Sequence, residues 1–64
     1  MGNVNYAYME ISVAVSILNM RLRDLYPSFD EFCIREDQIK EVLLKFFDEN
    51  GYYYDKKINQ LRPK

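Results

Sequence analysis

The sequence has no histidine, no tryptophan, one cysteine and only two glycines among its 64 residues. Without histidine the most common general base is missing, and so is the usual nitrogen ligand of zinc. The single cysteine, Cys33, rules out a disulfide within the chain. Two glycines are too few for a glycine-rich phosphate loop. These absences predict a protein that is not an enzyme, holds no metal or cofactor and takes no small-molecule substrate.

The short length predicts a single small helical domain over residues 1–64. Folding buries only about 60% of the surface of such a chain, so its core is marginal. Because neither a disulfide nor a metal supplements that core, we expect self-association or a protein partner. The sequence shows no signal peptide and no apolar run of about 18 residues. Together with the lone cysteine, this predicts a cytoplasmic protein without a membrane partner.

The first part of the chain has two competing interpretations. Residues 9–17 alternate apolar and polar side chains as an amphipathic strand would. Five apolar residues instead recur at helical steps, namely Ile11, Val15, Leu18, Leu22 and Leu25. No glycine or proline interrupts residues 6–26. We therefore predict a helix, with Asn5 as a candidate cap at its start.

A second, short helix is predicted after Pro27, which ends the first. Ser28 followed by Glu31 has the spacing of a capping box, in which the two side chains satisfy free amides at a helix start. This pattern predicts a short helix over residues 29–33.

The clearest helical pattern lies in the next segment. Its apolar residues follow the spacing of one helical face: Ile39, Val42, Leu43, Phe46 and Phe47. Glu36 and Asp37 are expected in the first turn, where the helix dipole favours acids. Asn50 and Gly51 provide a left-handed stop.

The C-terminal segment is predicted to contain little regular structure. Residues 52–54 are tyrosines with strand propensity, so we expect a short extended segment rather than a sheet. Residues 58–64 are expected to be a loose tail. The predicted fold is mainly α: a small helical domain of two main helices plus a short helix, with a short extended C-terminal segment.

The first predicted helix has a second apolar side, which is our first candidate site. Its members are Met9, Val13, Ile17 and Met20. Two short helices cannot cover both sides of the first, and an uncovered apolar stripe often marks an interface. We interpret it as a partner or homodimer interface. The alternative is that this helix is the central helix of a monomeric core.

Two further surfaces are candidates for binding. On the back of the last helix we expect an acidic strip consisting of Asp37, Glu41, Leu44 and Asp48. It would dock a basic partner, unless it is an ordinary solvated helix back. Near the C-terminus, aromatic rings beside positive charge suit single-stranded nucleic acid; these residues are Tyr52, Tyr54, Lys56 and Lys57. Cys33, between Phe32 and Ile34, is predicted to be a buried hydrophobic residue.

Two functions follow as hypotheses. The first is a small non-enzymatic regulator or inhibitor that acts by protein–protein binding, such as a phage or mobile-element accessory protein that blocks a host protein. The alternative is a DNA-binding transcriptional regulator, because the helix order and the Asn50-Gly51-Tyr52 step resemble the end of a winged helix. Charge disfavours it, since the chain has a formal net charge of −1 and nucleic-acid affinity depends on phosphate contacts.

Overall fold

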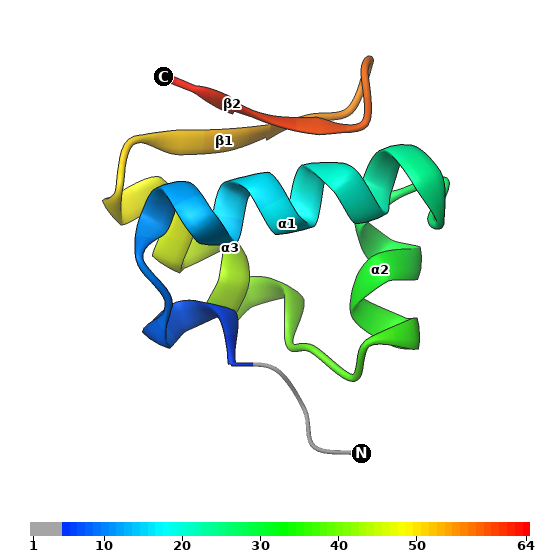
Figure 1. Cartoon of the computed structure of the whole chain (residues 1–64), viewed down its shortest axis with the longest axis horizontal. Coiled ribbons are helices and arrows are strands. Elements are labelled where there is room, and N and C mark those ends of the chain that lie inside the picture. The colour runs from blue at the N-terminus through cyan, green and yellow to red at the C-terminus, as the bar shows by residue number, and fades with distance from the viewer. Residues whose placement is uncertain (1–4) are drawn as a thin grey trace.

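A computed structural model describes residues 5–64 and contains helices followed by a hairpin (Figure 1). In chain order the elements are a 3₁₀ helix η1 (Tyr6–Tyr8), α1 (Ile11–Asp24), α2 (Phe29–Arg35), α3 (Lys40–Glu49), β1 (Tyr52–Asp55) and β2 (Gln60–Pro63). The prediction of a mainly helical fold is confirmed. The two strands form an antiparallel sheet that lies along one side of α1.

Residues 11–17 are helical rather than extended, so the helix prediction is confirmed for α1. The cap was predicted wrongly. The Glu10 carboxylate accepts a hydrogen bond from the Val13 N–H at 3.2 Å and thereby starts α1. Asn5 accepts from the Ala7 N–H at 3.2 Å and caps η1 instead. This earlier turn places Tyr6 in the core.

The predicted cap of α2 is confirmed, whereas α3 begins later than predicted. The Ser28 hydroxyl oxygen accepts from the Glu31 N–H at 3.1 Å. Glu36 forms the C-cap of α2, and Asp37 has a φ of 57°, in the left-handed region. Those two residues therefore belong to a turn, and α3 begins only at Lys40.

The later start of α3 changes which of its residues reach the core. Leu43 and Phe47 are buried, as predicted. Ile39 is 65% exposed because it precedes the helix, and Val42 is 51% exposed. Both were predicted on the core face. The turn between α2 and α3 thus leaves two apolar side chains at the surface.

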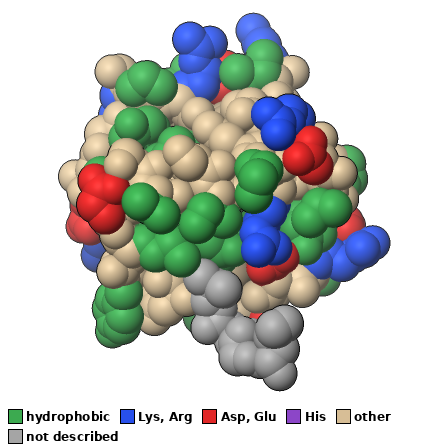
Figure 2. Space-filling model, viewed as in Figure 1, with side chains coloured by type: hydrophobic (Ala, Val, Ile, Leu, Met, Phe, Trp, Pro, Cys, Tyr) green, Lys and Arg blue, Asp and Glu red, His purple; other side chains and the backbone are tan. Residues whose placement is uncertain are grey.

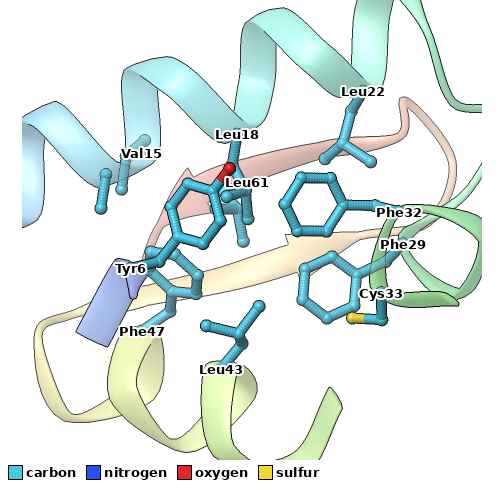
Figure 3. Close-up of a cluster of buried hydrophobic side chains, with 11 residues drawn as sticks. Tyr6, Val15, Leu18, Leu22, Phe29, Phe32, Cys33, Leu43, Phe47 and Leu61 are labelled. Carbon is cyan, nitrogen blue, oxygen red and sulfur yellow. The ribbon is translucent and has the colours of Figure 1, made fainter. Parts of the chain in front are cut away.

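The core lies between α1 and α3 and is closed by side chains from every other element (Figure 3). Helix α1 supplies Val15, Leu18 and Leu22, and Leu61 enters from β2. The centres of the Tyr6 and Phe32 rings lie 5.6 Å apart at a tilted angle, a favourable aromatic arrangement. This contact packs η1 against α2.

The C-terminal residues form a hairpin, so the prediction of a loose tail over 58–64 is wrong. Tyr52 pairs with Pro63, and Asp55 pairs with Gln60. Leu61 is only 4% exposed and belongs to the core. The sequence of this strand gives no alternating apolar pattern, because Leu61 is its single buried apolar residue.

Amide side chains of α1 and of the hairpin hold the two together. Asn19 Nδ2 donates to the Leu61 carbonyl at 3.1 Å, and Asn19 Oδ1 accepts from the Leu61 N–H at 2.7 Å. Asn59 Nδ2 donates to the carbonyls of Leu22 and Tyr26 near the end of α1, at 3.1 and 3.0 Å. Asn59 has a φ of 54°, a left-handed conformation that asparagine tolerates better than most residues. We call this set of contacts the amide clamp.

We predict that Asn59→Ala lowers the free energy of unfolding by about 2 to 3 kcal/mol, because part-buried carbonyls lose their donor. Asn59→Gly should cost about 1 kcal/mol less than Asn59→Ala, since glycine accepts a positive φ without strain. The measurement is urea denaturation, with Lys57→Ala as the exposed control in the same turn. A change below about 0.5 kcal/mol for Asn59→Ala, no larger than an ordinary surface substitution, would contradict the clamp.

Candidate functional site

The predicted apolar stripe on α1 is divided by the fold. Val13 and Met20 are 48% and 49% exposed. Met9 and Ile17 are partly buried and pack against the core. The uncovered part of the stripe is therefore Val13 and Met20, with Ile17 at its inner edge.

Charged side chains near these two residues lie toward the ends of α1, where Glu10 precedes Val13 by three residues and the exposed Arg23–Asp24 pair follows Met20. Ser12 and Ser16 are exposed beside Val13 and Met20, and we define the outer face of α1 as Ser12, Val13, Ser16 and Met20. From Ile11 to Leu22 the only charged side chain is Arg21, and it pairs with Glu36 at 2.8 Å. Figure 2, drawn from the same side as Figure 1, shows hydrophobic side chains gathered across the middle of this view, with positively and negatively charged side chains directly beside them on the right.

Arg21 belongs to a part-buried polar cluster that links α1 to the end of α2. The Tyr26 hydroxyl donates to the same Glu36 oxygen, Oε2, at 2.6 Å, and this hydrogen bond raises the pKa of Tyr26. Burial raises the pKa of the Tyr6 hydroxyl, which Arg21 opposes and Glu36 reinforces. Both phenols therefore stay protonated at neutral pH. The arrangement neutralises the one charge on the middle of α1 and fixes α1 against α2.

Cys33 is buried, as predicted. Burial raises the pKa of its thiol to about 11, with the charge of Asp30 adding in the same direction. The thiolate is the nucleophilic form, so this environment disfavours nucleophilic chemistry at Cys33.

Three residues of the predicted acidic strip, Glu41, Leu44 and Asp48, share one side of α3, whereas Asp37 lies outside the helix. Asp37 lies in the turn before α3, and Leu44 is partly buried against the core. Asp48 forms an ion pair with Lys64 near the end of the hairpin. Glu41 remains exposed on the outside of the helix. The exposed side of α3 carries acids together with Lys45 rather than a continuous acidic strip.

The predicted nucleic-acid contacts differ in how far they are exposed. Tyr52 and Tyr54 pack against the core. The Tyr54 hydroxyl donates to Asn59 Oδ1 at 2.6 Å and accepts from the Phe29 N–H at 3.3 Å. Of these four residues only Lys56 and Lys57, in the hairpin turn, are exposed. Tyr54 and Lys56 line one small pocket of about 100 Å³, but the Tyr54 ring packs against the core and its hydroxyl is bonded within the chain.

A shallow groove that the sequence analysis did not predict lies between η1 and α3. It encloses about 280 Å³ and is lined by Asn5, Ala7, Asp37, Gln38, Ile39, Val42 and Leu43. The groove arises because η1 packs against α3, which lies more than 30 residues later in the chain. Two of its apolar lining residues, Ile39 and Val42, gave no separate signal in the sequence, because their spacing also fits a core-facing side of the helix.

Two kinds of site are absent from the part of the chain that the structure covers. Within residues 5–64, no three acidic or cysteine side chains are grouped as a metal ion would require. Within the same residues, no helix has the length and apolarity needed to cross a membrane.

The segment that matches a protein-family model includes all three α-helices and most of the hairpin. The model of the family described as Domain of unknown function (DUF4250) matches residues 8–61. The chain belongs to this family. The matched residues include Val13 and Met20 as well as both asparagines of the amide clamp. No curated protein and no solved structure matches the chain.

The buried state of Cys33 leads to a prediction about its reactivity. Raising a thiol pKa from 9.0 to about 11 lowers the thiolate fraction at pH 8 about a hundredfold. We expect Ellman's reagent at pH 8 to react at least that much more slowly with the folded protein than with the protein in urea. Equal rates in the two states would show that Cys33 is accessible.

Proposed function

We propose that the protein is a small non-enzymatic regulator that acts by protein–protein binding through the outer face of α1. The observation that supports this most directly is the low charge along the middle of that face, where Val13 and Met20 are half exposed and Arg23 and Asp24, which follow Met20, pair with each other. An exposed helix of a soluble domain usually has a charged or polar outer side. The cores of protein interfaces are depleted in charge and enriched in methionine.

The way α1 is held also supports binding through this face. The hairpin contacts one side of α1 through Asn19, and the core packs against another. A partner would therefore meet a helix that is already ordered, which lowers the entropy cost of association. A non-enzymatic role is consistent with the buried, protonated thiol of Cys33.

We predict that Met20→Glu weakens self-association and partner binding at least tenfold, because a carboxylate would be desolvated at the centre of the contact. Lys45→Glu, on the exposed side of α3, is the matched control and should leave binding unchanged. The measurements are light scattering of the purified protein and quantitative pull-down from an extract of the source cells. Circular dichroism would check that each variant is folded.

The outcome that contradicts the proposal is also specific. If Met20→Glu retained every association of the unmodified protein, the binding surface would lie elsewhere. If the unmodified protein neither self-associated nor retained a protein from the extract, binding through α1 would be rejected.

A DNA-binding winged helix is the second candidate, and one observation favours it. Helix α2, a four-residue turn at 36–39 and α3 are followed directly by a hairpin. This is the order of a helix-turn-helix unit with a wing, and Asp37 supplies the left-handed residue that such a turn uses. Against it, the exposed charged residues of α3 are three acids and two bases, namely Glu41, Asp48, Glu49, Lys40 and Lys45, and Lys40 is paired with Asp30. Those acids would repel phosphates where a recognition helix enters the major groove.

The DNA-binding candidate predicts retention of duplex DNA that falls steeply between about 50 and 200 mM salt. Replacing Lys56 and Lys57 together by glutamate should abolish it, whereas Met20→Glu should not. Fluorescence anisotropy with a labelled duplex measures both effects. Our own expectation is that the unmodified protein shows no such binding, and salt-sensitive binding lost on the lysine changes would reverse the order of the two proposals.

A further inference from the structure

The hairpin has one closed edge and one open edge. On the edge of β2, Asn19 bonds the N–H and C=O of Leu61, and Pro63 has no N–H. In an antiparallel pair, residues that bond across the ladder alternate with residues whose backbone groups point outward. The backbone of Leu61 points outward, and Leu61 pairs with Tyr54. The N–H and C=O of Tyr54, and of Tyr52 two residues earlier, therefore point outward from β1.

These outward groups of β1 have no partner among residues 5–64. The Lys64 N–H donates to the Gly51 carbonyl at 2.8 Å, which agrees with this alternation along the ladder. Within residues 5–64, no hydrogen bond reaches the outward N–H or C=O of Tyr52 or Tyr54. Strand β1 also has neither the proline nor the lysine that proteins often place on an exposed edge. Its donors and acceptors are therefore free to bond another strand.

We propose that this edge of β1 binds an extended, acidic segment of another protein, which adds to the hairpin as a third strand. In such sites the backbone bonds give affinity, and pockets for alternate side chains give specificity. The hairpin packs on α1 through β2, so the edge lies away from the outer face of α1. The inference therefore adds a second binding surface to the one in the proposed function.

A small pocket beside the open edge fits one side chain of the added strand. It encloses about 100 Å³, and its lining residues are Ser28, Phe29, Asp30, Lys40, Tyr54 and Lys56. None of them belongs to α1 or β2, so the pocket lies on the side of β1 away from β2. The rings of Phe29 and Tyr54, with centres 5.2 Å apart, give it an apolar wall. Opposed residues of neighbouring strands share a face, so the partner residue opposite Tyr54 points toward this pocket.

The charges around the pocket favour an acidic partner. Lys40 is paired with Asp30 at 2.7 Å, so these two charges offset each other. Lys56 and Lys57 follow β1, are exposed, and have no ion pair within residues 5–64. Antiparallel pairing is the more stable kind per residue, and it brings the N-terminal end of the partner segment beside these lysines. A glutamate at that end, followed by β-branched residues, matches the edge.

An NMR titration of the isotopically labelled protein with a synthetic peptide tests the site residue by residue. The probe is acetyl-Glu-Thr-Val-Thr-Val-Thr-amide, which places its glutamate opposite Lys56 and its valines opposite Tyr54 and Tyr52. With the peptide at about 1 mM, a concentration suited to weak binding, we expect the amide signals of Tyr52 and Tyr54 to move downfield. Their hydrogen exchange should slow as well, whereas the Tyr53 amide already bonds across the ladder.

Peptides methylated at one backbone nitrogen are the matched controls. Methylation of either valine removes an N–H that bonds β1, and should weaken binding about threefold or more, as expected for one lost hydrogen bond. Methylation of the first or second threonine, whose N–H points away from β1, should change the affinity less than about twofold.

A charge exchange tests the acidic preference. Lys56→Glu should weaken binding of the probe about threefold, the effect of an exposed ion pair, and a peptide with lysine in place of glutamate should restore it. Lys45→Glu, on α3, is the control and should bind the probe as the unmodified protein does. A loss on Lys56→Glu that the lysine peptide does not reverse would overturn the acidic preference.

Three outcomes would overturn strand addition or its direction. Absence of any change at the amides of Tyr52 and Tyr54, or an equal loss from both kinds of methylation, would reject strand addition. Tighter binding of acetyl-Thr-Val-Thr-Val-Thr-Glu-amide would reject the antiparallel direction. Met20→Glu should bind the probe normally, because the edge lies away from the outer face of α1. If the probe failed while Met20→Glu still weakened partner binding, only this inference would fail and the proposed function would stand.

Discussion

The position of the hairpin depends on two asparagine side chains that replace missing backbone partners. Strand β2 is an edge strand, and its Leu61 amide and carbonyl are both bonded by Asn19 from α1. Asn59 bonds carbonyls of Leu22 and Tyr26, near the C-terminal end of α1, which no later helical turn can satisfy. Each of the two elements, α1 and the hairpin, thus provides an amide side chain that bonds backbone groups of the other. A two-stranded hairpin alone is marginal in water, so this clamp and the burial of Leu61 explain why it is ordered.

The clamp also determines which side of α1 remains available. The hairpin covers the side of α1 that carries Asn19, and the side with Leu18 and Leu22 packs into the core. Arg21 pairs with Glu36. What remains is the outer face, with half-exposed Val13 and Met20. The packing of α1 therefore determines which surface is available for binding. Its low charge follows from the uncharged residues that the sequence has at these exposed positions.

Local signals in the sequence predicted the helices well and the long-range contacts poorly. Ser28 with Glu31 marked the start of α2, and apolar spacing marked α1. The start of α3 was predicted too early because acidic residues such as Glu36 and Asp37 are favoured in a first helical turn. In the structure Glu36 is instead bonded to Arg21 and Tyr26, and Asp37 adopts a left-handed conformation, so neither belongs to α3. The hairpin was missed because asparagine reads as a turn residue, and nothing local shows that its amide bonds a helix 37 residues away.

The candidate site was predictable only in part for the same reason. Helical projection found Val13 and Met20, but it could not show that Met9 and Ile17 pack against the core.

Hydrogen exchange measured amide by amide tests the central claim, that the hairpin and α1 form one unit, most directly. The account predicts that the Leu61 amide exchanges with the same free energy of opening as the amides of Leu18 and Leu22. A Leu61 amide that exchanges at the rate of an unprotected tail, while α1 stays protected, would contradict it.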